Sequence, residues 1–357
     1  MNHDKRVAII GHFGGNEQFL DGQTVKTKTL YNELLETTNW RIQKVDTYFR
    51  RKNPVKLVFQ TVRALITSRD IIIITSQNGR RVFFPILYFA TKVLKTRVFH
   101  DVIGGRLAKF VEECPSFRKY LNSFQVNWVE TERVKNDLDK VGVHNSVLLP
   151  NFKKLQIAQM DELLLTEGKP FKLCVFSRVM QEKGIGDAVA AVIAVNEMLN
   201  ETAYSLDIYG PVDPQQEVWF ENLKEQFPDY IRYCGAVHYK DSVETLKGYF
   251  ALLFPTRYYT EGVPGTIIDA YAAGVPVIAS QWESFSDVIE HGVTGFGFKF
   301  GDTSGFVDLL IQVVKFPERI TNLIPNCLEA ARYYLPEKSV RVIVDTIDGT
   351  GNCSGKR

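Results

Sequence analysis

The sequence predicts an α/β fold made of two Rossmann-like domains, each with a doubly wound parallel sheet. The first observation is a unit of strand, glycine-rich loop and helix over residues 7–35, which is how such a sheet begins. The second is a new series of strands that starts at Leu173, after a polar linker over residues 152–170. The third is the length of 357 residues, which is enough for two domains of ordinary size.

Each half supplies further short apolar runs that suit buried strands. In the first half these are residues 71–75, 97–99, 128–131 and 147–149. In the second half they are residues 173–176, 205–210, 231–237, 252–254 and 275–279. Continuous apolar runs of this kind are typical of parallel strands that are covered on both faces. A last helix is expected over residues 336–348.

The composition is that of a globular cytosolic protein. Hydrophobic residues make up 45% of the chain and charged residues 24%. The five cysteines are scattered and odd in number, which favours reduced thiols. The longest apolar run, residues 82–90, contains a proline and is far shorter than the roughly 20 residues that a membrane span needs. We expect no metal site, because no DxD pair follows a strand and no His/Cys cluster is present.

Charge is distributed unevenly along the chain. The net charge is only +2, but residues 41–109 hold 15 basic and 3 acidic residues. Such a basic segment suggests an anionic partner for the first half. The sequence carries no motif of nucleic-acid recognition, so we expect no nucleic-acid partner and favour an anionic membrane surface.

Residues 80–95 are the segment that the sequence suggests for contact with the membrane. They read RRVFFPILYFATKVLK, an aromatic-rich apolar segment with basic ends. The pattern is typical of a helix lying among lipid headgroups, with Phe83, Phe84 and Tyr88 inserted. An ordinary buried helix with basic flanks explains the same pattern, and the sequence leaves both interpretations open.

Two residues of the first half are candidate ligand contacts. Gly22 directly precedes a helix, whose first amides lack partners and attract phosphate. The loop before it is not GxGxxG, so the dinucleotide fingerprint is absent. His100 follows the apolar run 97–99, and the carboxyl end of a parallel strand faces the ligand. A structural histidine in a turn is the alternative.

A pair of cations follows the first strand of the second half. Arg178 and Lys183 lie in SRVMQEKG, residues 177–184, between that strand and a helix. Two cations at a strand end can neutralise a diphosphate without a metal ion.

The stretch over residues 258–274, YYTEGVPGTIIDAYAAG, predicts a second anion site. A proline suits the first helical position, after which the amides of Gly265 and Thr266 are free to bind an anion. The acids Glu261 and Asp269 flank these amides and would repel a phosphate, so we expect them to bind hydroxyl groups. A phosphorylated sugar or a nucleotide offers both kinds of group. The alternative is that Glu261 caps the helix and Asp269 is a solvated surface residue.

These motifs resemble those of the retaining GT-B glycosyltransferases of family 4, the type found in bacterial surface-polysaccharide assembly. The resemblance rests on Glu261, seven intervening residues, an acid, and then AAGVPV over residues 272–277, together with the SRVMQEKG segment. It implies two Rossmann-like domains that face a central cleft. It also implies an acceptor-binding domain over residues 1–152, a nucleotide-sugar-binding domain over 171–335, and a helix with a tail over 336–357 that returns to the first domain.

The resemblance also implies roles for the residues already singled out. Arg178 and Lys183 would stabilise the leaving diphosphate, while Glu261 and His100 would lie at the transferred sugar. The substrate-binding residues would be Gly22, Val237, Gly265, Thr266 and Asp269. Among these, Val237 would lie against the nucleobase and Asp269, where the family has Glu, would bind the ribose.

The implied reaction is transfer of a sugar from a nucleotide-diphosphate sugar to a saccharide or lipid-linked saccharide acceptor. The resemblance implies retention of configuration, without a metal or cofactor, on the inner face of the cell membrane. Two alternatives remain open: a non-catalytic GT-B subunit that binds a partner or a membrane, and a sugar-nucleotide epimerase of the same fold.

Overall fold

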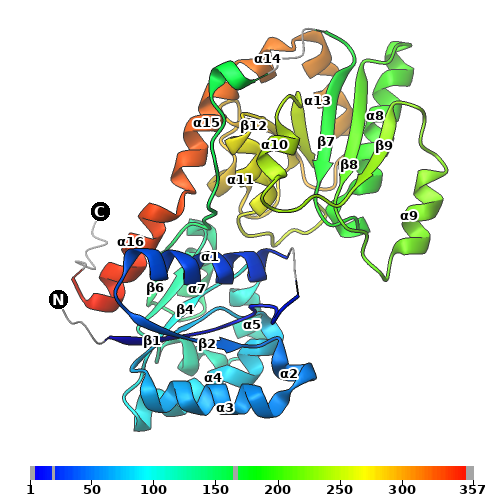
Figure 1. Ribbon diagram of the computed structural model, residues 1–357. Helices are drawn as coiled ribbons and strands as arrows, with labels where there is room; N and C mark the ends of the chain where they lie inside the picture. The colour runs from blue at the N-terminus through cyan, green and yellow to red at the C-terminus, as the bar shows by residue number, and fades with distance from the viewer. Residues whose placement is uncertain (1–4, 18–20, 164–167, 351–357) are drawn as a thin grey trace. The chain divides into compact units, whose positions relative to one another are not determined.

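The computed structural model describes residues 5–17, 21–163 and 168–350 (Figure 1). The chain divides into two compact units. Unit 1 holds the residues up to Lys154 and those from Leu335 onward, and unit 2 is Leu155–Tyr334. Each unit contains one six-stranded sheet whose paired strands are all parallel, with helices on its faces. This confirms the predicted α/β fold class.

The sheet of unit 1 has the strand order β2-β1-β3-β4-β5-β6. The strands are β1 (Arg6–Gly11), β2 (Arg41–Asp46), β3 (Asp70–Ile73), β4 (Arg97–Asp101), β5 (Val126–Val129) and β6 (Ser146–Leu148). The chain moves outward from β1 to β2 in one direction and from β3 to β6 in the other. Because crossovers between parallel strands are right-handed, this reversal puts helices on both faces.

Helix α1 (Gly22–Thr37) covers one face of this sheet and shares it with α16 (Pro336–Asp348). Leu30 of α1 and Ile343 of α16 belong to one buried cluster with Ile9 of β1. The remaining helices of unit 1 are α2 (Phe49–Lys52), α3 (Pro54–Thr67), α4 (Gln77–Val93), α5 (Leu107–Glu113), α6 (Phe117–Leu121) and α7 (Glu132–Lys140). The crossover rule places them on the other face.

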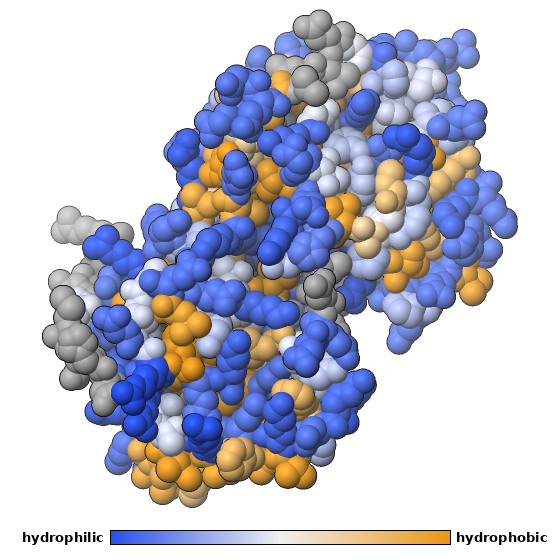
Figure 2. Space-filling view, in the orientation of Figure 1, coloured by the Kyte–Doolittle hydropathy of each residue, from blue (hydrophilic) through white to orange (hydrophobic). Residues whose placement is uncertain are grey.

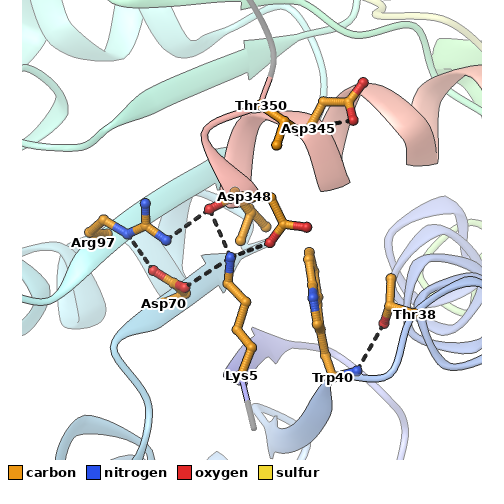
Figure 3. A network of polar contacts seen from close by, with 9 residues as sticks. Lys5, Thr38, Trp40, Asp70, Arg97, Asp345, Asp348 and Thr350 are labelled. Carbon is orange, nitrogen blue, oxygen red and sulfur yellow. Dashed lines mark hydrogen bonds and ion pairs between the residues drawn. The ribbon is translucent and has the colours of Figure 1, made fainter. Parts of the chain in front are cut away.

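A polar network fixes the carboxyl end of the last helix to the rest of unit 1 (Figure 3). Lys5 Nζ donates to the carbonyl oxygen of Ile347 at 2.9 Å, and Arg97 Nη2 donates to the same oxygen at 2.8 Å. Asp70, which is almost fully buried, accepts from Arg97 Nε at 2.6 Å. Helix carboxyl ends leave carbonyls without partners, so these two cations stabilise the end of α16.

The sheet of unit 2 has the order β12-β11-β10-β7-β8-β9. Its strands are β7 (Phe171–Phe176), β8 (Tyr204–Tyr209), β9 (Ile231–Gly235), β10 (Ala251–Phe254), β11 (Val277–Ser280) and β12 (Gly295–Phe298). Its helices are η1 (Met160–Glu162), η2 (Gln181–Lys183), α8 (Ile185–Leu199), α9 (Glu217–Lys224), α10 (Ser242–Leu246), α11 (Gly265–Ala272), α12 (Phe285–Val288), α13 (Thr303–Lys315), α14 (Glu318–Thr321) and α15 (Ile324–Tyr333). Two large apolar clusters and a third, small one form its core.

The structure of α4 contradicts one part of the membrane hypothesis, the insertion of Phe83 and Phe84. Phe83, Phe84 and Arg80 are buried against unit 1, so the expectation that the two phenylalanines insert into lipid is wrong. The reason is helical periodicity, which turns every third or fourth residue of an apolar segment toward the sheet. No helix in the described part of the chain is both long and apolar enough to span a bilayer.

Candidate active site

The candidate site of unit 2 lies where two neighbouring strands send the chain in opposite directions. Strands β7 and β10 pair in parallel, with Cys174 opposite Leu252. From β7 the chain continues through α8 to β8, whereas from β10 it continues through α11 to β11 on the other side. In open α/β sheets the crevice at such a switch point, at the carboxyl ends of the strands, is where ligands bind.

The loop after β7 is held against the end of β10. Gly184 has a φ of 71°, and a Cβ atom there would lie 1.9 Å from the carbonyl oxygen of Pro255, so only glycine permits this approach. The amide of Arg257 donates to the carbonyl oxygen of Glu182 at 2.9 Å. These contacts fix the position of Lys183, the last residue of η2.

Lys183 and Glu261 form an ion pair at this switch point. Their side chains are 21% and 16% exposed, so the pair is partly screened from water. Thr256 Oγ1 donates to Glu261 Oε1 at 3.3 Å, and Lys183 Nζ lies 5.8 Å from the ring centres of Phe254 and Tyr258. The structure thus joins two residues that the sequence placed in separate motifs.

Arg178 also follows β7, but it is more exposed than Lys183. Its Nη1 lies 3.7 Å from Asp213 Oδ2, and half of its side chain faces solvent. An exposed guanidinium keeps its donors available, and its planar fork suits two phosphate oxygens. Within the described residues, no group of three or more His, Cys, Asp or Glu side chains is arranged to hold a metal ion.

Helix α11 presents its amino-terminal end at the same strand edge. Pro264 has an extended backbone and is the residue before the helix. Helix α11 therefore begins one residue later than the sequence predicted. In the part of the chain that is described, no acceptor meets the amides of Gly265 and Thr266. The hydroxyl oxygen of Thr266 is buried and likewise has no partner there. Free amides of this kind at helix amino termini attract anions, and anion binding by Gly265 and Thr266 stays a prediction.

Asp269 and Val237 complete the predicted set in unit 2. Asp269 lies one turn into α11 and is only 3% exposed, so it is not the solvated surface residue of the alternative interpretation. Val237 lies in the loop after β9, two strands away from β7 in the sheet. It is partly exposed, and its contact with a nucleobase stays a prediction.

His100 occupies a different environment from the one expected. Strand β4 extends through Asp101, so His100 lies inside the strand and is completely buried. Its Nδ1 is 3.0 Å from Asn127 Oδ1, and its ring meets Phe84 edge-on at 4.9 Å. Burial, with the nearby charge of Arg80, lowers the pKa of His100 to about 3. This environment suits a neutral structural histidine, and a contact with the transferred sugar stays a prediction.

Gly22 is the first residue of α1 and is exposed. The preceding residue, Asp21, caps the helix: its Oδ1 accepts from the amide of Thr24 at 3.0 Å and its Oδ2 from the Thr24 hydroxyl at 2.6 Å. A carboxylate at this position competes with any phosphate for the helix end. The phosphate contact of Gly22 therefore stays a prediction, and residues 18–20 of its loop lie outside the described part of the chain.

A buried ion cluster at the carboxyl ends of β4 and β5 was not predicted. Lys26 of α1 donates to Asp101 at 2.7 Å and to Glu130 at 3.0 Å, and all three residues are at most 9% exposed. Burial alone would lower the pKa of Lys26, but the two carboxylates outweigh it and raise that pKa to about 12. The only sequence signal was that both acids stand at or just after a strand end.

Part of the chain is similar in sequence to known glycosyltransferases. Residues 170–315 match the family described as Glycosyl transferases group 1. Over 149 residues the chain is 22% identical to the amylovoran biosynthesis glycosyltransferase AmsK of Erwinia amylovora, a match that covers 41% of this chain and 36% of that protein. The chain spans about a third of the length of several curated relatives that it matches.

Two solved structures resemble the whole chain in fold. Anabaena HepE in complex with UDP and glucose has a TM-score of 0.73 at 11% identity and covers 97% of this chain and 100% of its own. The sucrose-phosphate synthase of Thermosynechococcus elongatus has a TM-score of 0.76 at 14% identity, with 97% and 99% covered. At such identities the likeness shows the fold.

Proposed function

We propose that this chain is a glycosyltransferase of the retaining family 4 type, which transfers a sugar from a nucleotide-diphosphate sugar to a saccharide or lipid-linked saccharide. The observation that carries the proposal is the Lys183–Glu261 pair beside the amino terminus of α11, at the switch point of the sheet. It provides cationic and amide donors for a diphosphate and a carboxylate for sugar hydroxyls. The family match over residues 170–315 includes all of these residues.

In this proposal the diphosphate is the leaving group. As the bond between the anomeric carbon and the phosphate oxygen breaks, negative charge develops on the diphosphate, where Arg178, Lys183 and the amides of α11 stabilise it. The acceptor hydroxyl attacks the anomeric carbon from the leaving-group face, and its proton passes to the departing phosphate oxygen. The new bond then keeps the original configuration. Glu261 orients the sugar, and no metal ion is required.

The donor assignment uses the remaining residues of unit 2. Asp269 accepts hydrogen bonds from the ribose hydroxyls, and its burial excludes competing water. The HepE neighbour was solved with UDP and glucose, which makes a uridine nucleotide the first donor to test. The matched proteins are called glycosyltransferases or synthases, so the non-catalytic alternative is not favoured.

The acceptor assignment concerns unit 1. We propose that unit 1 binds the glycan acceptor and that the protein acts in polysaccharide biosynthesis on the cytoplasmic face of the membrane, as a peripheral protein. The excess of basic residues over residues 41–109 supports this placement.

A thermal-shift screen with nucleoside diphosphates and their sugars tests the donor assignment. A ligand that binds only the folded state raises the melting temperature. With the stabilising donor and a glycan acceptor, we expect free nucleoside diphosphate and a new glycoside in equal amounts. An isomerised nucleotide sugar without glycoside would instead identify an epimerase. Absence of stabilisation by every nucleotide would contradict the proposal.

A further inference from the structure

The outward side of α3 is apolar along its whole length. The exposed residues are Val55, Val58, Phe59, Val62 and Ile66, between 49% and 77% exposed. Their spacings from Val55 are those of a single helix face. The opposite side of α3, which includes Leu57 and Ala64, packs into the core of unit 1. The helix therefore has an apolar side that the fold does not use.

Helix α4 repeats this arrangement. Its exposed apolar residues are Val82, Ile86, Phe89 and Val93, between 38% and 63% exposed, and they again occupy one helix face. The inner side of α4, with Phe84 and Leu87, enters the same core cluster as the inner side of α3. Soluble monomers rarely expose so many large apolar side chains together.

The two exposed sides belong to one face of unit 1. Helix α3 connects β2 to β3 and α4 connects β3 to β4, and both crossovers run in the same direction along the sheet. Right-handed crossovers then place both helices on the same face. Figure 2 shows hydrophobic residues gathered along the lower edge of unit 1, where Figure 1 places α3.

The charges around these helices are almost all positive. Residues 47–95 contain ten Lys and Arg residues and a single acid, Asp70. Asp70 is buried, whereas every cation of this segment except Arg80 is exposed. Lys56 and Arg63 lie on α3 itself, beside the apolar residues. A second copy of this chain would bring like charges together at the edge of such a contact, whereas an anionic surface would be attracted.

We propose that the apolar sides of α3 and α4 form the surface on which this protein docks to an anionic lipid bilayer. The inference rests on the peripheral association proposed above and gives it a location. Apolar side chains such as Phe59 and Phe89 enter the boundary between headgroups and acyl chains, as an interfacial amphipathic helix does. The surrounding lysines and arginines reach the lipid phosphates while their stems stay on apolar surface.

Sedimentation of the full chain with vesicles tests this surface. The unaltered protein should bind vesicles that contain phosphatidylglycerol more tightly than vesicles of phosphatidylcholine alone. The double variant Val55→Glu/Ile66→Glu should bind the anionic vesicles at least about 25-fold less tightly, since each of the two charges near an anionic surface changes binding about fivefold and apolar insertion is lost as well. Its matched control is Val218→Glu/Met198→Glu, at positions 77% and 66% exposed on α9 and α8 of unit 2, which should bind like the unaltered protein.

The lysines and arginines around the apolar residues lead to a separate prediction. Lys56→Gln/Arg63→Gln should weaken binding at low salt and lose its effect at high salt, because the screening length of exposed charges falls from about 30 Å at 0.01 M salt to about 3 Å at 1 M. The effect of Val55→Glu/Ile66→Glu should persist at high salt in part, because it also removes apolar insertion. Melting temperature should stay unchanged in all variants, since these side chains are exposed. Nucleotide affinity should stay unchanged in the two variants of α3, which lie outside unit 2.

Three results would overturn the inference, and each differs from failure of glycosyl transfer. If the unaltered protein does not bind anionic vesicles, the docking surface and the peripheral association are both wrong, while the proposed donor binding is unaffected. If both Glu double variants bind like the unaltered protein, the docking surface lies elsewhere. If ultracentrifugation without lipid finds a dimer that Val55→Glu/Ile66→Glu makes monomeric, this face joins two copies of the chain.

Discussion

Lys183 is the residue on which the proposed chemistry depends most. We expect Lys183→Ala to lower turnover by roughly 10²–10³-fold, the usual loss for one donor to the transition state. Folding should survive, because the side chain is partly exposed and belongs to neither apolar core cluster of unit 2. Steady-state kinetics with the donor found by thermal shift measures the effect. Lys224→Ala, on the surface of α9, is the control and should keep full turnover; near-normal turnover in both variants would remove Lys183 from the diphosphate site.

The burial of His100 predicts that the free energy of unfolding depends on pH. Its pKa is about 3 in the folded protein, below the ordinary value of 6.5, because burial disfavours the charged ring. Below pH 6.5 the unfolded chain gains a proton at this residue that the folded chain does not accept. The folded state therefore loses stability as pH falls from 6.5 toward 3, by about 3 kcal/mol at pH 4.5.

Thermal melts at pH 7 and pH 4.5 measure this dependence. In His100→Gln the loss between the two pH values should be smaller than in the unaltered protein, whatever the absolute melting temperatures. The exposed His144 serves as the control, because His144→Gln should leave the pH dependence intact. Identical pH dependence in all three proteins would show that His100 is not neutral in the fold.

At the residue scale the sequence singled out candidate residues but did not show how their side chains lie relative to one another. Spacing within a motif is local, so Arg178, Lys183 and Glu261 could be singled out from their own segments. The ion pair between Lys183 and Glu261 joins residues 78 positions apart, and only the pairing of β7 with β10 brings them together. The burial of His100 was missed because β4 continues two residues beyond its apolar run.

At the scale of elements, α16 contributes to the stability of unit 1 through its apolar side. Ile343 is completely buried in the cluster beneath α1. Ile343→Ala should lower the free energy of unfolding of unit 1 by about 2–5 kcal/mol, from lost apolar burial and the cavity left behind. Arg341→Ala, at an exposed position of the same helix, should change it little. Denaturant melts monitored in unit 1 compare the two, and equal effects would show that α16 does not support the core.

The exposed sides of α3 and α4 show what periodicity alone leaves open. An apolar run of nine residues reveals a helix but does not reveal which of its residues turn toward a sheet. The run over residues 82–90 therefore suggested that Phe83 and Phe84 face outward, whereas the fold turns them inward and exposes their neighbours. The outward side of α3 was overlooked because its inner side also contains apolar residues.

At the scale of the whole molecule, the two units have separate cores and should unfold in separable steps. A nucleoside diphosphate that binds unit 2 should raise the melting temperature of unit 2 only. At a concentration 100 times its Kd it should raise the free energy of unfolding of that unit by about 2.7 kcal/mol. Ile343→Ala should lower only the melting temperature of unit 1. Calorimetry resolves the two, and a single transition that both changes move together would show that the units unfold cooperatively.

The division into two α/β units followed from length and from the order of strands and helices, both of which can be read along the chain. The strand orders of the two sheets could not be read this way, since they depend on crossovers between distant segments. The switch point between β7 and β10, on which the whole site rests, is such a property.

The interruption of unit 1 by unit 2 has a consequence for synthesis on the ribosome. Chains fold as they emerge, from the amino terminus onward, yet α16 is made only after the whole of unit 2. Until then the buried cluster that contains Ile9, Leu30 and Phe99 lacks the apolar residues that α16 contributes to it in the finished protein. We expect unit 2 to be complete first, although it starts later. Nascent chains stalled with residues up to 334 outside the ribosome should already bind a nucleoside diphosphate, while a protease still cleaves them within unit 1.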